Sequence, residues 1–116
     1  SPAMNLFETV AISNDSVKIN DTIIKTNTNL TNLKDKKIKL GIRSEFIKIA
    51  NDQTENLLNV DVDKVEDLGN YKLLTAKMGN LIIKSKINRE TEVPSSNVRL
   101  HIPAEKCCVY ENDKLI

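Results

Sequence analysis

Few residues of this chain have the chemistry of a catalytic or metal-binding group. The 116 residues contain one histidine, His101, and two cysteines, the adjacent pair Cys107 and Cys108. Adjacent cysteines do not have the spacing of zinc ligands, and a nucleophilic cysteine needs an activating base that the sequence does not indicate. We therefore expect His101 to be a solvated residue on the outward side of a strand. At least one cysteine should be a small buried apolar group.

The cysteines also bear on where the protein works. A disulfide between neighbouring residues is badly strained, and one such pair cannot hold a secreted fold together. We expect reduced thiols in a cytoplasmic protein. The start of the chain, Ser1-Pro2-Ala3-Met4-Asn5, has neither a basic nor an apolar stretch, so we expect no signal peptide.

The charged clusters have simpler interpretations than a reaction site. Four carboxylates alternate with apolar residues, which is typical of the wet side of a strand and does not match a calcium loop; they are Asp61, Asp63, Glu66 and Asp67. A second cluster is basic and is interpreted as a solubilising loop edge: Lys34, Lys36, Lys37 and Lys39. The three glycines are isolated and no phosphate-binding loop is present, so we expect neither binding nor hydrolysis of ATP by this chain.

The composition excludes whole classes of partner. Seventeen Lys and Arg residues against sixteen Asp and Glu residues give a net charge of +1, with 40% hydrophobic and 28% charged residues. This composition is typical of a globular domain. A net charge of +1 gives no strong positive electrostatic field that would attract nucleic acid. Two Tyr, two Phe and no Trp offer few stacking platforms for single-stranded nucleic acid. No apolar run approaches the roughly 20 residues of a membrane span. We expect no nucleic-acid partner.

In the segments that position these residues, apolar and polar residues alternate, which is the pattern of β-strands. Leu58, Val60 and Val62 alternate with polar residues, and the phase then slips, which predicts a bulge near Asp63-Lys64. Gly79-Asn80 between two alternating runs predicts a two-residue hairpin turn.

Further strands are predicted by the same alternation, and polar stretches between them are predicted to be loops. The strands are Phe7–Ile12, Val17–Ile19, Thr22–Lys25, Ile38–Ile42, Phe46–Ile49, Tyr71–Lys77, Leu81–Ile87 and Val98–Ile102; the loops are Thr26–Asn32, Asn51–Asn56 and Asn88–Ser96. No window of eleven residues has a helical stripe, although Glu55–Leu58 or Ala104–Cys107 could form one turn. Nine or ten short strands favour an all-β barrel or sandwich with little helix and an aliphatic core.

Short motifs, in order, carry a resemblance to a known family. Leu40-Gly41-Ile42-Arg43-Ser44-Glu45 and Val65-Glu66-Asp67-Leu68-Gly69-Asn70 are followed by the stretch 98–110, with its Pro103-x-Glu105 turn. Together with the opening Ser1-Pro2-Ala3-Met4-Asn5-Leu6, they resemble the C-terminal regulatory domain of sugar-importing ABC transporter ATPases of the maltose and glycerol-3-phosphate type. Ser44 stands where that family usually has Pro, Ser95-Ser96 where a Gly is common, and Tyr110 where Phe is usual.

The resemblance implies a small all-β, OB-fold-like barrel of the TOBE type, excised from a longer chain. Residues 1–36 would be the first strands after the junction with the ATPase domain, and residues 37–116 the core barrel. The fragment itself would be no enzyme and hold no cofactor, because ATP and Mg²⁺ belong to the missing ATPase domain. The function implied is regulation and dimerisation of the ATP-binding subunit of an importer for glycerol-3-phosphate or a sugar.

The partners implied are a second ATPase subunit, the permease subunits through the missing ATPase domain, and a regulatory protein. The location implied is the cytoplasmic face of the cell membrane. The alternative that the residues leave open is a stand-alone barrel that binds a small solute, either an oxyanion or a sugar.

The motif residues themselves favour a structural role over solute binding. Gly41 and Gly69 adjoin alternating apolar residues, where glycine permits a bulge or a close strand crossing. Arg43 and Glu45 lie two apart at a strand end, so both could point to one face and pair with each other or with the backbone. The remaining motif residues stand at predicted bends: Glu66, Pro103 and Glu105.

Overall fold

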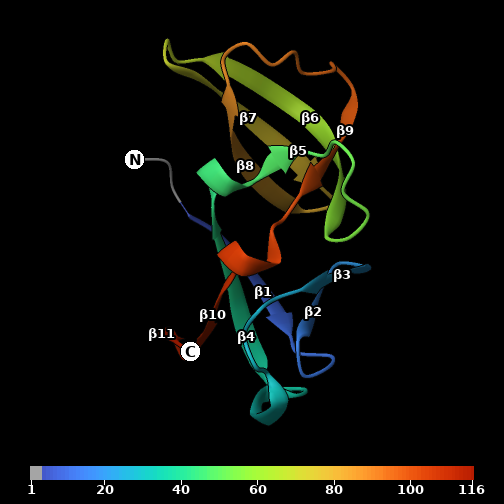
Figure 1. The fold of residues 1–116 in the computed structure, drawn as a ribbon, viewed down its shortest axis with the longest axis vertical. Helices are drawn as coiled ribbons and strands as arrows, with labels where there is room; N and C mark the ends of the chain where they lie inside the picture. The colour runs from blue at the N-terminus through green and yellow to red at the C-terminus, as the bar shows by residue number, and fades with distance from the viewer. Residues whose placement is uncertain (1–3) are drawn as a thin grey trace.

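The computed structural model describes residues 4–116, and within them the chain forms eleven β-strands and three 3₁₀ turns (Figure 1). The strands are β1 (Met4–Val10), β2 (Ser16–Ile19), β3 (Thr22–Lys25), β4 (Lys37–Arg43), β5 (Lys48–Ile49), β6 (Leu57–Asp67), β7 (Tyr71–Met78), β8 (Leu81–Asn88), β9 (Asn97–His101), β10 (Cys108–Glu111) and β11 (Lys114–Leu115). The turns are η1 (Thr31–Leu33), η2 (Ser44–Phe46) and η3 (Ala104–Lys106). None of the described segments is a helix long and apolar enough to cross a membrane.

The strands form two lobes stacked along the long axis of the molecule (Figure 1). Lobe 1 contains the sheet β1-β4-β10-β11 and the β2-β3 hairpin, which a bridge between Ala11 and Val17 attaches to the end of β1. Lobe 2 is the five-stranded sheet β5-β9-β6-β7-β8, and all its pairs are antiparallel. The expected all-β, OB-fold-like architecture is confirmed.

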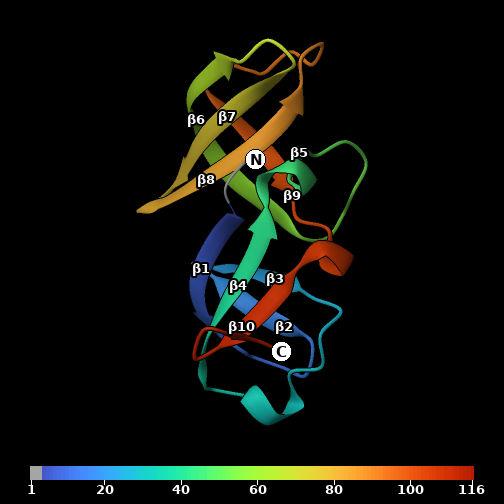
Figure 2. The same cartoon turned by 90° about the vertical axis from the view of Figure 1, so that its left-hand side faces the viewer.

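Each lobe borrows one strand from the other half of the chain. From β4 in lobe 1 the chain passes through η2 into β5, which pairs with β9 in lobe 2. From β9 it passes through η3 into β10, which returns to pair with β4 (Figure 2). The chain is therefore two repeats, β1–β5 and β6–β10, that exchange their last strands. Neither lobe is complete without both halves of the sequence.

The two crossovers have the same geometry. Each begins at a residue with extended backbone, Arg43 (φ −71°, ψ 143°) or Pro103 (φ −67°, ψ 125°), and makes one 3₁₀ turn. Pro103 suits its place, because its ring fixes φ near this value. The turns meet each other: the Nζ of Lys106 lies 4.7 Å from the centre of the Phe46 ring, a cation–π contact between equivalent positions of the two repeats.

A buried asparagine from each repeat joins the lobes. Asn5, on β1, donates its Nδ2 to the carbonyl of Lys84 on β8 (2.9 Å) and accepts the backbone N–H of Lys84 at Oδ1 (2.8 Å). Its Nδ2 also lies 3.3 Å from the carbonyl of Ile42. The side-chain amide thus pairs with the edge of β8 as a neighbouring strand would.

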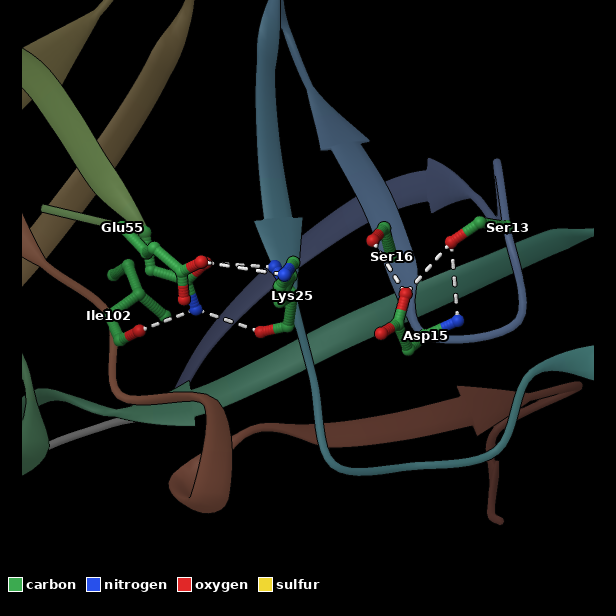
Figure 3. Close-up of polar contacts among 7 residues, drawn as sticks. Ser13, Asp15, Ser16, Lys25, Glu55 and Ile102 are labelled. Atoms are coloured by element: carbon green, nitrogen blue, oxygen red, sulfur yellow. Dashed lines mark hydrogen bonds and ion pairs between the residues drawn. The ribbon is translucent and has the colours of Figure 1, made fainter.

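Asn56 makes the equivalent contact in the opposite direction. Its Oδ1 accepts the N–H of Lys25 at the end of β3, and its Nδ2 donates to the carbonyls of Lys25 and Ile102, all at 2.8 Å. Figure 3 shows the Lys25 and Ile102 carbonyls that this amide joins. Both asparagines are only 7% exposed, so an unpaired amide here would be costly.

The core is aliphatic, as the composition predicts. Phe7 is the one aromatic side chain among the buried residues of the described chain. The fully buried aliphatic side chains come from both lobes and the crossovers: Val17, Ile24, Leu30, Leu40, Ile42, Ile47, Leu58, Leu74, Ile83, Leu100, Ile102 and Val109.

Most local predictions are confirmed. The register of β6 against β7 shifts between Val62 and Lys64, where the bulge was expected. Gly79 and Asn80 form the turn between β7 and β8, with φ +61° at Gly79. The predicted strand Phe46–Ile49 is wrong at its start, because η2 occupies 44–46 and only Lys48–Ile49 pair with β9. Of the two stretches that could form one helical turn, Ala104–Cys107 does so, as η3, and Glu55–Leu58 does not, since β6 begins at Leu57.

Removing one of the two buried side-chain amides tests whether these asparagines join the lobes. We expect Asn5→Ala to lower the free energy of unfolding by about 2 kcal/mol, because it leaves the buried backbone groups of Lys84 without partners. Asn59→Ala, on the exposed side of β6, should change it by less than about 0.5 kcal/mol. Urea melts of both variants measure the difference, and equal midpoints would contradict a joining role for Asn5.

The two positive-φ glycines supply a second test. We expect Gly69→Val and Gly79→Val each to cost roughly 1–3 kcal/mol, because φ is +93° and +61° at these positions. At Gly79 a Cβ would also lie 3.2 Å from Nδ2 of Asn20, so this variant should be the worse of the two. Lys36→Ala, whose contact with Glu111 is a long, exposed ion pair (3.9 Å), should be silent within about 0.5 kcal/mol. Similar urea midpoints for all three would refute the backbone argument.

Candidate functional site

A broad depression lies over lobe 1, and we name it groove A. It is open to solvent and has a volume of about 610 Å³. Its lining comes from β1, β2, β4 and the β10-β11 turn: Glu8, Thr9, Val10, Lys18, Asn20, Lys37, Ile38, Lys39, Tyr110, Asn112 and Asp113.

Strand pairing explains why these side chains gather. Glu8 on β1 and Tyr110 on β10 both stand opposite Lys39 of β4, so the three project from the same side of the sheet. Lys37 stands opposite Val10 one step further along. The curl of β2 against the end of β1 adds a wall to this surface, where the Thr9 hydroxyl donates to the carbonyl of Lys18.

Groove A is weakly basic. Lys18, Lys37 and Lys39 face two carboxylates, and the Nζ of Lys39 pairs with Oδ1 of Asp113 at 3.1 Å. Within residues 4–116, Lys18 and Lys37 have no ion pair within 4 Å. Two ammonium groups without an ion-pair partner can bind a small anion, because charge-assisted hydrogen bonds are the strong ones; the Thr9 hydroxyl adds no donor, since its proton goes to the Lys18 carbonyl.

The equivalent depression in lobe 2, groove B, is lined by the matching parts of β6 and β9. It has a volume of about 530 Å³ and is lined by Asn59, Val60, Asp61, Asn97, Val98 and Arg99. Arg99 takes the place of Lys39 and Asn59 that of Glu8, as the registers of the two sheets show. Groove B has one cation and one carboxylate, so lobe 1 is the more basic of the two.

Gly41, singled out by the sequence, lies where strands approach closely. A Cβ at this position would fall 2.8 Å from Sδ of Met4, 2.9 Å from Cε2 of Tyr110 and 3.2 Å from Cδ2 of Leu6. Glycine is needed there for space, as the predicted close crossing requires.

The other residues of the first and last motifs lie on the crossovers. Arg43 ends β4 and Glu45 lies in η2, yet the two form no ion pair within 4 Å, so no contact supports the predicted pairing between them. Pro103 precedes η3, and Glu105 lies within it. Equivalent glutamates thus stand in both turns, outside groove A.

The middle motif lies at the far end of lobe 2. Glu66, on β6, is 3.7 Å from the Nζ of Lys64. The carboxylate of Asp67 accepts the backbone N–H of Gly69 at 2.9 Å, and this hydrogen bond, with Arg89 nearby, lowers the pKa of Asp67. The motif therefore forms a turn, and none of its residues reaches groove A.

The histidine and the cysteines do not form a site. His101 is half-buried, on the outer side of lobe 2, and residues 4–116 hold no cluster of three potential metal ligands among His, Cys, Asp and Glu. Cys107 is buried and Cys108 is partly exposed, and both are free thiols. Burial, with smaller effects of Cys108 and Glu105, raises the pKa of Cys107 to about 12.

The polar side chains at the start of β2 in lobe 1 are hydrogen-bonded to one another. The hydroxyls of Ser13 and Ser16 both donate to Oδ1 of Asp15 at 2.9 Å, and these bonds lower the pKa of Asp15 (Figure 3). Both hydroxyls are used within the turn, which explains the turn and offers no reactive group.

The sequence patterns did not predict the two buried asparagines that join the lobes, or the exchange of strands. Both stand in an Asn-Leu dipeptide, Asn5-Leu6 and Asn56-Leu57, but the same dipeptide also occurs at 29–30, 32–33 and 80–81. The dipeptide therefore does not single out the two positions without the fold. The lysines of groove A were noted only in part, since Lys18 lies on a different strand from the lysine cluster.

This architecture defines the fold: the chain is an all-β pair of small OB-fold-like barrels. One solved structure that shares it is that of ModG, described as a cytoplasmic molybdate-binding protein and determined with molybdate bound. The TM-score is 0.78 over 91% of this chain and 94% of that chain, with 11% sequence identity. At that identity the likeness shows the fold alone. Neither a family model nor a curated protein matches the sequence.

The two thiols should differ sharply in reactivity. At about pH 8 we expect a thiol-specific disulfide reagent to modify Cys108 in the native protein and Cys107 only after unfolding, because the buried thiol stays protonated. Cys108→Ser should then abolish the rapid reaction. Two thiols reacting at equal rates in the native protein would show that Cys107 is accessible.

Proposed function

We propose that this chain binds a small oxyanion in groove A. The observation that carries the proposal is that two lysines from different strands, Lys18 and Lys37, line one depression and have no ion-pair partner among the described residues. A small oxyanion has several acceptor atoms around one centre, which suits donors that arrive from different strands.

The fold supports this choice of ligand. A solved protein with the same architecture is described as molybdate-binding, and this makes a tetrahedral oxyanion the first ligand to test. A sugar is the less favoured solute, because Tyr110 is the one aromatic residue lining groove A.

Titration calorimetry with molybdate, tungstate and sulfate tests the proposal. We expect saturable binding of at least one oxyanion, and Lys18→Ala and Lys37→Ala should each weaken it by about tenfold, the loss of one charge-assisted hydrogen bond. Lys64→Ala, in lobe 2 and already paired with Glu66, is the matched control and should bind as the unchanged protein does.

Added salt should weaken this binding, because the lysines are exposed and their charges are screened. Heat release that never saturates, or binding that Lys64→Ala weakens as much as Lys37→Ala does, would contradict groove A as the site.

A second function is favoured by a different observation, the order of the sequence motifs. We propose as the alternative that the chain is the regulatory and dimerisation domain of the ATP-binding subunit of an ABC importer for glycerol-3-phosphate or a sugar. The segments that resemble that family, around Gly41 and Pro103, adjoin or form the two crossovers on which the strand exchange depends. Under this proposal, ATP and Mg²⁺ bind in a preceding ATPase domain, and permease subunits and a regulator are partners at the membrane.

The coding sequence upstream of Ser1 separates the two functions. A phosphate-binding loop and an ABC signature directly before it would support the importer subunit. An upstream reading frame without them would reject this alternative and leave the oxyanion proposal untouched.

A further inference from the structure

A carboxylate lines groove A beside its lysines. Glu8 on β1 stands directly opposite Lys39 on β4, so both side chains project from the same side of this strand pair. Side chains in that relation have Cβ atoms about 5 Å apart. Glu8 is exposed and lines the groove together with Lys18 and Lys37. An anion that these two lysines hold therefore lies beside the Glu8 carboxylate.

The Glu8 carboxylate forms no ion pair within residues 4–116, taking 4 Å as the limit. Its cross-strand neighbour Lys39 pairs instead with Asp113, whose Oδ1 lies 3.1 Å from the lysine Nζ. An ionised carboxylate accepts hydrogen bonds and donates none. Of the two carboxylates that line groove A, Asp113 is thus engaged by a lysine and Glu8 is the one left to accept a hydrogen bond from a ligand.

The strand pair does not require a carboxylate at this position. Asn59 holds the matching position in lobe 2, where it stands opposite Arg99 as Glu8 stands opposite Lys39. A side-chain amide carries no charge and offers a donor as well as an acceptor. Because lobe 2 forms the same strand pair without the carboxylate, the charge of Glu8 is a property of groove A and not of the fold.

An acceptor placed among cations distinguishes oxyanions by whether they carry a proton. Sulfate and molybdate present acceptor atoms only, so one of their oxygens would meet the Glu8 carboxylate with like charge. In mildly alkaline solution, phosphate and arsenate have the same shape and the same double negative charge as sulfate, but one of their oxygens carries a hydrogen. That O–H can donate to Glu8 while the other oxygens accept from the lysines. Repulsion of one ligand and a hydrogen bond to the other together give specificity.

We propose that Glu8 makes groove A selective for a protonated oxyanion, of which inorganic phosphate is the simplest. Lys18 and Lys37 donate to the oxygens of the anion, and Glu8 accepts its hydrogen. Glu8 is then the residue that separates phosphate and arsenate from sulfate, molybdate and tungstate. The inference rests on the proposed function, since it names the class of oxyanion that the same groove takes.

Titration calorimetry of the full chain with phosphate, arsenate, sulfate and methyl phosphate tests this selectivity. At about pH 8 methyl phosphate has lost its last proton, because the second pKa of a phosphate ester is about 6, so it should behave as sulfate does. We expect phosphate and arsenate to bind about tenfold more tightly than sulfate. A closed site built around a ligand hydroxyl reaches roughly 10⁴-fold, and groove A is open to solvent, which reduces the difference.

Glu8→Gln removes the charge and keeps the length of the side chain. We expect this variant to lose the roughly tenfold preference for phosphate over sulfate, mainly because sulfate binds more tightly once the like charge is gone. Glu111→Gln is the matched control: it removes the same charge from lobe 1, at a residue that stands opposite Lys114 and does not line groove A. Its general electrostatic effect is equal for two dianions, so the preference should be unchanged.

The outcomes separate this inference from the function on which it rests. Absence of saturable binding by every oxyanion, phosphate included, would reject both the anion site and its selectivity. Sulfate that binds the unchanged protein as tightly as phosphate would reject the selectivity alone and leave groove A as an anion site. A preference for phosphate that persists in Glu8→Gln, or that Glu111→Gln removes equally, would reject the role of Glu8.

Discussion

The structure depends on a pair of side-chain amides that act as short pieces of β-strand. Asn5 and Asn56 each offer one acceptor and one donor to the backbone of a single lysine on the edge of the other lobe. An edge strand otherwise presents unpaired peptide groups, which are costly when buried and prone to pair with other chains when exposed. The two amides therefore pair with one residue each on the edges of β8 and β3, and both contacts join the two lobes.

The exchange of strands and the hydrogen bonds of Asn5 and Asn56 both hold the two lobes together. Because β5 and β10 belong to opposite halves of the chain, the lobes cannot separate without breaking their sheets. The crossovers must then meet near the centre, where Phe46 and Lys106 are in contact. The turns η2 and η3 share one geometry, and each carries the chain from one lobe into the other.

The local pattern of the sequence predicts the parts of this fold that neighbours along the chain decide. The slip after Val62 lies in the β6-β7 hairpin and the Gly79 turn in the β7-β8 hairpin, so neighbouring residues decide both and each was predictable. The all-β fold class follows from the number of short strands that the alternation predicts. Strand exchange was not predictable, because the partner of β5 is decided by residues about fifty positions away. Arg43 and Glu45 lie at the end of β4 and within η2, a 3₁₀ turn that the alternation of the sequence did not predict.

The candidate site was harder to foresee than the fold, for a physical reason. Groove A takes Lys18 from β2, Lys37 from β4 and Tyr110 from β10, so only the assembled lobe brings them together. The fold constrains the buried positions of both repeats, and these stay aliphatic in each lobe. It leaves the outer positions free, and there the repeats have diverged to apolar and basic in lobe 1 and to polar in lobe 2. The proposed anion site, groove A, lies on the surface of lobe 1 at positions where the two repeats differ.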